Sequence, residues 1–312
     1  MLFSKNVEDE KTWAEIKKDI DVFKPLIANI LQNEQLSQNE ILSVKQCTNA
    51  VFKVGSLIIK IFAPNESGHD TERGYKSELF GQMRALSLGL TVPKILASGI
   101  IKDKYDFPYI VSEFIDGVEL NGLLGNLETN KKYTLGMKLR KITDKLNTPC
   151  EQFNHIEYPE VIVSDGYNDW LIDLGYQKKF FDERIKYIRS LGINKNNLVF
   201  CHGDMAICNI LYDSNEELHI IDFACSVLAP VCVDHSYVAF WTDFDKAFIN
   251  GYFGEISIDE LIEICFNGFL LSINGIDYLA NGLEYGFIDG KSCESIEDFK
   301  VQFGEYIIKK ML

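Results

Sequence analysis

The hydrophobic positions near the start of the chain follow a helical period. Apolar side chains recur there at spacings of three and four, with charged residues between them: Trp13, Ile16, Ile20, Phe23 and Ile27. This spacing predicts amphipathic helix, and Pro25 predicts a break into two pieces. We therefore expect a helical extension over about the first forty residues.

From Ile41 onward the hydrophobic pattern changes to short β-rich runs. In ILSVKQCTNAVFKVGSLIIKIFAP these runs are separated by CTNA and VGS, which predicts antiparallel strands. TERGYKSELFGQMRALSLGL has helical spacing and ends near Gly89, and TVPKILASGIIKDKYDFPYIVSEFI predicts two more strands around a polar turn. After Gly117 the pattern predicts mainly helices, interrupted by a strand-rich segment from Val199 to Phe223.

These elements predict an α+β chain with a small β-rich lobe followed by a larger, mainly helical lobe. We place the N-terminal lobe at residues 1–114, including the extension of about forty residues, and the C-terminal lobe at residues 115–312. The length of 312 residues, with 46% apolar and 25% charged residues, is typical of a soluble globular protein. The eight cysteines form no C-x-x-C pair, which disfavours zinc. The charged start MLFSKNVEDEKTW is unlike a signal peptide, so we expect a cytoplasmic protein.

The negative charge is concentrated in the second lobe. Residues 1–114 carry 14 basic and 15 acidic residues, net −1, whereas residues 115–312 carry 17 and 31, net −14. Two long stretches, between Lys145 and Lys178 and between Lys246 and Lys291, contain no Lys or Arg. Such a field disfavours nucleic acid and anionic membranes as partners and attracts cations.

The segment VFCHGDMAICNILYDSNEELHIIDF holds the residues that suggest chemistry. Asp204 and Asn209 lie five apart on one loop between short apolar strands, and Asp222 ends the next strand. Carboxylate and amide oxygens are suitable ligands for Mg²⁺. A phosphoryl-transfer site needs such ligands together with a carboxylate that accepts the proton of the attacking hydroxyl.

This pattern, H-G-D-x₄-N followed by a strand and I-D-F, resembles the aminoglycoside phosphotransferase and choline kinase superfamily, a branch of the protein-kinase fold. The resemblance covers roughly residues 41–245. It implies a two-lobed protein-kinase-like fold, with Asp204 as catalytic base and Asn209 and Asp222 as Mg²⁺ ligands. His202 then shapes the loop, and Asp234 braces it.

The same resemblance implies a nucleotide site for ATP or GTP in the first lobe. Lys60, in the apolar run GSLIIKIF, matches the lysine that holds the phosphates, and Glu78 fits as its partner better than Glu72. The phosphate-covering loop falls in SVKQCTNAVFKV, where glycines are absent and Thr48 and Asn49 supply the donors. Glu113 and Ile115 would form the hinge that contacts the purine.

The two stretches without Lys or Arg point to a cationic acceptor. Asp169 and Asp173, with Asp165, are spaced by four in SDGYNDWLIDLGY and share a helix face. We expect further acids, Asp243, Asp245, Asp277, Glu284 and Asp289, to add negative charge that no base offsets. Trp241, like Trp170, is a candidate to stack on a sugar or a quaternary amine, although a tryptophan is more often part of a core.

Three functions remain open from the sequence. The first is a kinase that phosphorylates a hydroxyl of a small polycation, with an aminoglycoside as the leading candidate. The second is a metabolic kinase of the same fold acting on choline, an amino alcohol or a sugar, and the third is a catalytically silent nucleotide-binding protein. We expect a monomer, with a dimer also open.

Overall fold

The chain forms two compact units. The computed structural model describes residues 1–44, 48–153, 177–272 and 293–312. The first unit comprises Met1–Gly117 together with Asp213–Cys225, and the second comprises Val118–Tyr212 and Ser226–Leu312. Residues 213–225, which the sequence placed in the second lobe, thus pack with the first. The predicted α+β architecture is confirmed.

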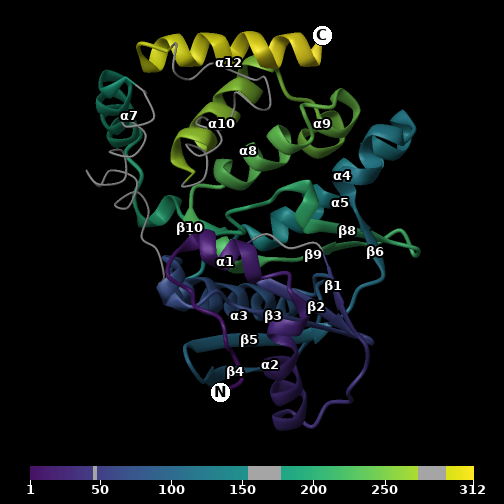
Figure 1. Cartoon of the computed structure of the whole chain (residues 1–312). Helices are drawn as coiled ribbons and strands as arrows, with labels where there is room; N and C mark the ends of the chain where they lie inside the picture. The colour runs from purple at the N-terminus through teal and green to yellow at the C-terminus, as the bar shows by residue number, and fades with distance from the viewer. Residues whose placement is uncertain (45–47, 154–176, 273–292) are drawn as a thin grey trace. The chain divides into compact units, whose positions relative to one another are not determined.

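The first unit is built on a five-stranded antiparallel sheet (Figure 1). Its strands lie in the order β1-β2-β3-β5-β4: β1 (Ile41–Ser43), β2 (Ala50–Val54), β3 (Leu57–Ile61), β5 (Asp106–Glu113) and β4 (Ile95–Lys102). In the register, Lys60 on β3 lies opposite Val51 on β2 and Ile110 on β5. Because side chains alternate along a strand, Ile59 and Ile61 face the other side of the sheet from Lys60.

Two N-terminal helices cover that apolar side of the sheet. α1 (Glu10–Ile16) and α2 (Ile20–Asn33) bury Trp13 and Phe23 in one cluster with Phe52 and Ile59. The predicted break at Pro25 is wrong, because Pro25 lies inside α2. The chain breaks earlier, at residues 17–19, where the Asp19 side chain accepts the first amides of α2 and starts a new helix.

Helix α3 belongs to the same unit. It runs over Thr71–Ser87, is capped by Asp70, and is followed by Gly89 at a φ of 68°. A short 3-10 turn, η1 (Asn65–Ser67), precedes it, and β9 (Leu218–Ile220) and η5 (Phe223–Cys225) complete the unit. A Cβ on Gly81 would lie 2.7 Å from the Phe223 side chain, so only glycine lets η5 lie this close to α3.

The second unit is mainly helical. Its helices are α4 (Leu120–Leu123), α5 (Thr129–Leu146), α7 (Lys178–Ser190), α8 (Cys232–Trp241), α9 (Lys246–Phe253), α10 (Ile258–Leu271) and α12 (Ile296–Met311), with short 3-10 turns η2 (Leu124–Asn126), η3 (Lys195–Asn197) and η4 (Ile207–Asn209). Strands β7 (Val199–Cys201) and β10 (Val227–Ala229) pair antiparallel. In β6 (Gly117–Glu119) and β8 (Ile210–Asp213) the chain passes from one unit to the other.

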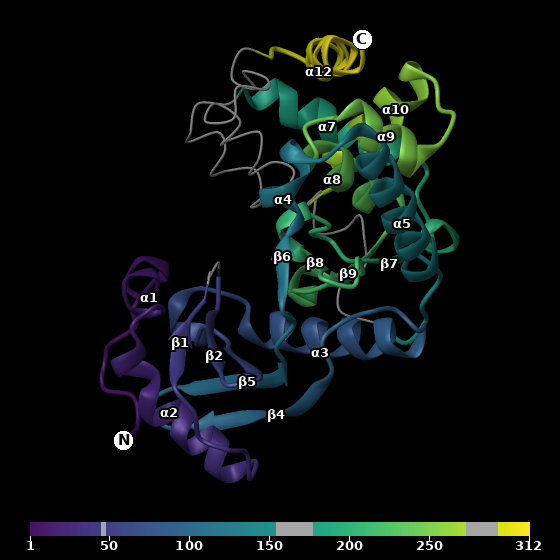
Figure 2. The same cartoon turned by 90° about the vertical axis from the view of Figure 1, so that its right-hand side faces the viewer.

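Aromatic side chains fill the core of the second unit. Phe266, Phe269, Phe299 and Phe303 bring α10 and α12 together. α5 and α9 lie side by side (Figures 1 and 2). No helix within the described ranges is both long enough and apolar enough to cross a membrane.

Candidate active site

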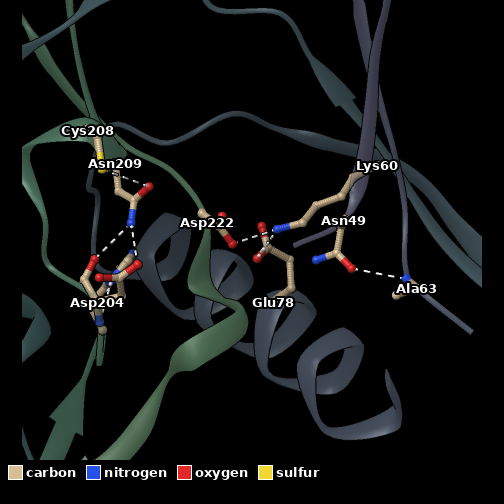
Figure 3. A network of polar contacts seen from close by, with 9 residues as sticks. Asn49, Lys60, Ala63, Glu78, Asp204, Cys208, Asn209 and Asp222 are labelled. Carbon is tan, nitrogen blue, oxygen red and sulfur yellow. Dashed lines mark hydrogen bonds and ion pairs between the residues drawn. The ribbon is translucent and has the colours of Figure 1, made fainter. Parts of the chain in front are cut away.

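In the first unit, one buried ammonium group lies between two carboxylates (Figure 3). The Lys60 Nζ donates to Glu78 Oε2 at 3.0 Å and to Asp222 Oδ1 at 2.7 Å. The three side chains come from β3, from α3 and from the residue before η5. The pairing of Lys60 with Glu78 is thus present, whereas Glu72 instead pairs with Lys76 at the surface.

The two carboxylates keep Lys60 charged. Burial by itself lowers the pKa of a lysine, but the charges of Asp222 and Glu78 outweigh it and raise the pKa of Lys60 above its ordinary value. The Lys60 and Glu78 side chains are only 11% and 7% exposed, whereas Asp222 is 38% exposed. The site therefore combines a fixed positive charge with a carboxylate that solvent can reach.

Backbone geometry places Asp222 beside this lysine. Its φ of 64° lies in the left-handed region, which aspartate tolerates better than most residues with a side chain. The next residue, Phe223, is fully buried and packs against Gly81 of α3, and the Ile220 amide donates to the Thr91 carbonyl. These contacts hold the I-D-F segment on the first unit.

In the second unit, the loop between β7 and β8 carries Asp204 and Asn209 in direct contact. The Asn209 Nδ2 donates to the Asp204 carbonyl at 3.0 Å and to Asp204 Oδ2 at 2.9 Å (Figure 3). The amide oxygen of Asn209 points away from Asp204, toward the Cys208 thiol 4.0 Å distant. The five-residue spacing in the sequence therefore does bring these two side chains together.

Asp234 and Asn147 support the start of this loop. The buried Asp234 carboxylate accepts the amides of His202 at 2.8 Å and Gly203 at 2.9 Å, and Gly203 adopts a φ of 79°. Asn147, which follows α5, donates to Asp234 Oδ2 at 2.7 Å and to the Phe200 carbonyl at 3.0 Å. No sequence signal singles out Asn147, because its spacing from the H-G-D motif has no helical or strand period.

His202, the histidine of the H-G-D motif, also contacts the backbone of the loop. His202 is fully buried, and its Nδ1 accepts the Asp204 amide at 3.3 Å. This contact ties the His202 ring to the backbone of the loop, so the histidine helps to shape the loop. Burial raises the pKa of Asp234, an effect that is reduced by His202, by Asn147 and by the two loop amides.

The donor set fits Mg²⁺ better than a softer metal. Because the Asn209 Nδ2 is committed to Asp204, the amide oxygen is the end left to face a cation, and a thiol is only a weak competing donor. In the first unit, the Asp222 carboxylate is a second oxygen donor of the kind that Mg²⁺ prefers. Mg²⁺ typically takes one or two protein oxygens and completes its shell with phosphates and water. Within the described part of the chain, no three His, Cys, Asp or Glu side chains are placed so that they could hold a metal ion by themselves, and a phosphate-bound Mg²⁺ requires no such group.

Comparison with known families agrees with this geometry. A sequence model described as the phosphotransferase enzyme family, APH, matches residues 46–261. The chain belongs to this phosphotransferase family. A search of proteins with curated functions gave no significant match.

Solved structures show that this phosphotransferase has a kinase-like fold. The GDP and kanamycin complex of APH(2")-IIia is 17% identical, with a TM-score of 0.60, covering 91% of this chain and 99% of that one. A microcompartment-associated aminopropanol kinase is 14% identical, with a TM-score of 0.55 and coverage of 92% and 95%. A choline/ethanolamine kinase family protein from Mesorhizobium loti is 17% identical, with a TM-score of 0.53 and coverage of 88% and 92%.

The residues expected at the nucleotide of this phosphotransferase lie around the sheet of the first unit. The Thr48 carbonyl accepts the Trp13 indole N–H at 2.8 Å, and Asn49 Oδ1 accepts the Ala63 amide at 3.1 Å. At the expected hinge, the Glu113 amide donates to Lys94 at 3.0 Å, and the Ile115 carbonyl accepts the Gly117 amide at 3.0 Å. The Glu113 amide is therefore already used within the protein, whereas the Ile115 carbonyl can accept a second hydrogen bond.

The acceptor candidates are placed only in part. Asp165, Asp169, Trp170, Asp173, Asp277, Glu284 and Asp289 lie outside the described residues. Trp241 ends α8, partly exposed, with its ring edge-on to Phe240. The expectation that Asp243 and Asp245 have no basic neighbour is wrong: Asp245 pairs with Lys132 at 2.7 Å, and Asp243 pairs with Lys310. These bases come from helices distant in sequence, which a linear charge count cannot detect.

Proposed function

We propose that this phosphotransferase is a small-molecule kinase that transfers the γ-phosphate of ATP or GTP to a hydroxyl of a cationic acceptor, with an aminoglycoside as the leading candidate. The observation that carries the proposal is the buried Lys60 between Glu78 and Asp222. A buried cation is costly without a function or a partner. Here it is kept charged beside a carboxylate that a metal can reach.

Each residue has a separate role in the proposed reaction. Lys60 binds the phosphates, and Glu78 keeps its ammonium in place. Asp204 accepts the proton of the attacking hydroxyl, while the Asn209 amide holds that carboxylate in one orientation. Asn209 and Asp222 would each supply an oxygen to Mg²⁺, and the bound ion would neutralise phosphate charge.

The negative charge of the second lobe supports a polycationic acceptor. Its net charge of −14 (17 basic against 31 acidic residues) attracts cations. A kinase acting on choline, an amino alcohol or a sugar is the alternative. It is supported by the fold shared with an aminopropanol kinase and a choline/ethanolamine kinase family protein. A single-amine acceptor would need fewer carboxylates than a polyamine.

A panel assay tests the proposal and its alternative together. Phosphate transfer from ATP and from GTP is measured, with Mg²⁺ present, against aminoglycosides, choline, amino alcohols and sugars. Transfer to aminoglycosides supports the first function, and transfer confined to amino alcohols, choline or sugars supports the alternative. Nucleotide binding without transfer to any acceptor would support a catalytically silent protein.

The variant Asp204→Asn is the chemical control for that assay. Loss of a positioned base is expected to lower kcat by about 10²–10⁴-fold, with nucleotide affinity nearly unchanged. The amide keeps the size of the side chain, so the contact with Asn209 is altered little. Turnover close to that of the wild type would remove Asp204 from the mechanism.

A further inference from the structure

The N-terminal extension touches the loop proposed to cover the phosphates. Trp13, in α1, is fully buried and donates its indole N–H to the Thr48 carbonyl at 2.8 Å. The Trp13 ring also packs edge-on against Phe23 of α2, with the ring centroids 5.7 Å apart. The indole is thus held by helix packing on one side and holds the backbone of Thr48 on the other.

The next residue, Asn49, has its side-chain amide fixed in one orientation. Its Oδ1 accepts the Ala63 amide at 3.1 Å, so the Nδ2 donor faces the opposite way. In Figure 3 this nitrogen points away from Ala63, in the direction of the Glu78 and Lys60 side chains.

Asn49 lies at the bend that directly precedes β2, close to the strand that carries Lys60. Val51, two residues later, is the partner of Lys60 in the β2–β3 register, so the side chains of Val51 and Lys60 share a face of the sheet. Figure 3 shows the Asn49 amide on the side of the Lys60 and Glu78 side chains, so Asn49 Nδ2 is a fixed donor near the charge of Lys60.

We infer that Trp13 is a positioning residue for nucleotide phosphates: by holding Thr48, it sets the place of the Asn49 donor. The inference rests on the proposed function and assigns part of it to the N-terminal extension. Trp13 itself touches no nucleotide. It acts through the backbone of Thr48. Loss of its indole N–H therefore weakens phosphate binding and leaves the binding of the purine and of the acceptor unaffected.

The extension has a second, independent attachment that serves as a control. At the β4–β5 turn, the Tyr105 hydroxyl accepts the Val7 amide at 2.9 Å, and Asp103 accepts the amides of Leu2 and Phe3. Trp13→Phe removes the indole N–H and keeps an aromatic ring against Phe23. Tyr105→Phe likewise removes one hydrogen bond of the extension, but far along the chain from Thr48.

The test compares nucleotides with nucleosides in three proteins: the wild type, Trp13→Phe and Tyr105→Phe. The dissociation constants of Mg-ATP, Mg-GTP, adenosine and guanosine are measured by calorimetry. Loss of one hydrogen bond predicts a rise of about 3- to 10-fold in the nucleotide dissociation constant of Trp13→Phe. Nucleoside binding by Trp13→Phe, and all binding by Tyr105→Phe, stay at the wild-type values.

Two results would overturn the inference. The first is a nucleotide affinity of Trp13→Phe equal to that of the wild type. The second is an affinity loss that is equal for nucleotides and nucleosides, or equal in Trp13→Phe and Tyr105→Phe, because such a loss indicates a general loosening of the unit. Failure of the wild type to bind any nucleotide is a different result, since it removes the proposed function itself.

A second measurement covers the case in which Trp13→Phe does not fold. The chain has three tryptophans, so Trp170→Phe with Trp241→Phe leaves Trp13 as the single tryptophan, whose emission can be excited selectively over that of the tyrosines. Its fluorescence is expected to change when Mg-ATP is added and not when adenosine is added. If Mg-ATP binds and the Trp13 emission does not change, the coupling between Trp13 and the phosphates is contradicted.

Discussion

At the scale of single residues, the site depends on charges that stabilise one another. Lys60 is buried and remains an ammonium because Glu78 and Asp222 face it. Asp222 has a second proposed role as a metal ligand, and its left-handed backbone is one that asparagine also tolerates. Asp222→Asn therefore tests the charge of this residue with its backbone preserved.

For Asp222→Asn we expect the apparent Mg²⁺ affinity in the kinase assay to fall by at least about tenfold, because an amide binds a hard cation more weakly than a carboxylate. The measurement is a Mg²⁺ titration at fixed nucleotide. Glu72→Gln, at an exposed acid on α3, is the control and leaves the titration unchanged. An unaltered metal requirement in Asp222→Asn would rule out Asp222 as a ligand.

His235 makes the stability of the second unit dependent on pH. It is buried on α8, edge-on to Tyr252 and Phe253, and its Nε2 has no hydrogen-bond partner within the described residues. Burial and the charge of Arg140, opposed by Asp144, lower the pKa of His235 from 6.5 to about 4. Between these pH values the unfolded chain binds a proton that the folded chain does not.

The free energy of unfolding is therefore expected to fall as the pH drops from 6.5 to 4, by up to about 3 kcal/mol from this residue alone. His235→Phe removes the titration and should flatten the pH dependence across this range. Urea unfolding at several pH values measures it, and His69→Gln, at a partly exposed histidine, is the control. A slope in His235→Phe equal to the wild type would contradict the assignment.

At the scale of elements, the contact between α5 and α9 depends on glycine. A Cβ on Gly136 would lie 2.3 Å from the Phe248 carbonyl oxygen, and one on Gly251 would lie 2.0 Å from the Tyr133 carbonyl oxygen. Both obstacles are backbone atoms, which cannot rotate away as a side chain can. The two helices approach this closely only because both positions lack a side chain.

Gly136→Ala is expected to lower the free energy of unfolding by about 1–3 kcal/mol, the usual cost of overpacking. Alanine has the higher helix propensity, so propensity alone predicts the opposite sign. Gly122→Ala on α4 is the matched control, since nothing lies within 4 Å of the added Cβ. Urea unfolding compares the two, and stabilisation in both variants would show that α5 and α9 can separate without cost.

At the scale of the whole molecule, the charge asymmetry predicts how the acceptor binds. The acid surplus belongs to the second lobe, although Asp243 and Asp245 are already paired with lysines. Attraction between a cation and exposed carboxylates is screened over about 10 Å at 0.1 M salt. The acceptor KM should therefore rise with salt more steeply than the nucleotide KM.

Asp169→Asn and Asp173→Asn should raise the acceptor KM and leave kcat near the wild-type value, because they remove uniform binding. Asp259→Asn, at an exposed acid in the first turn of α10, is the control of equal charge change. Initial rates at several salt concentrations measure both effects. An acceptor KM indifferent to salt and to these substitutions would favour the choline, amino alcohol or sugar alternative.

The sequence by itself determined most of the elements and the candidate site residues. Hydrophobic period distinguishes strand from helix locally, so the strands around Lys60, helix α3 and the strands flanking the H-G-D loop were all predictable. An isolated lysine in an apolar strand requires a partner, and the family resemblance pointed to Glu78 as that partner, which the structure places 3.0 Å from Lys60.

Only the tertiary structure decided which distant segments meet. It assigned residues 213–225 to the first unit, paired Asp243 and Asp245 with lysines of other helices, and brought Asn147 to Asp234 and Trp13 to Thr48. Such contacts join residues far apart in the chain, and no local period or propensity encodes them. They arise when buried faces pack and polar groups enclosed by that packing must find hydrogen-bond partners.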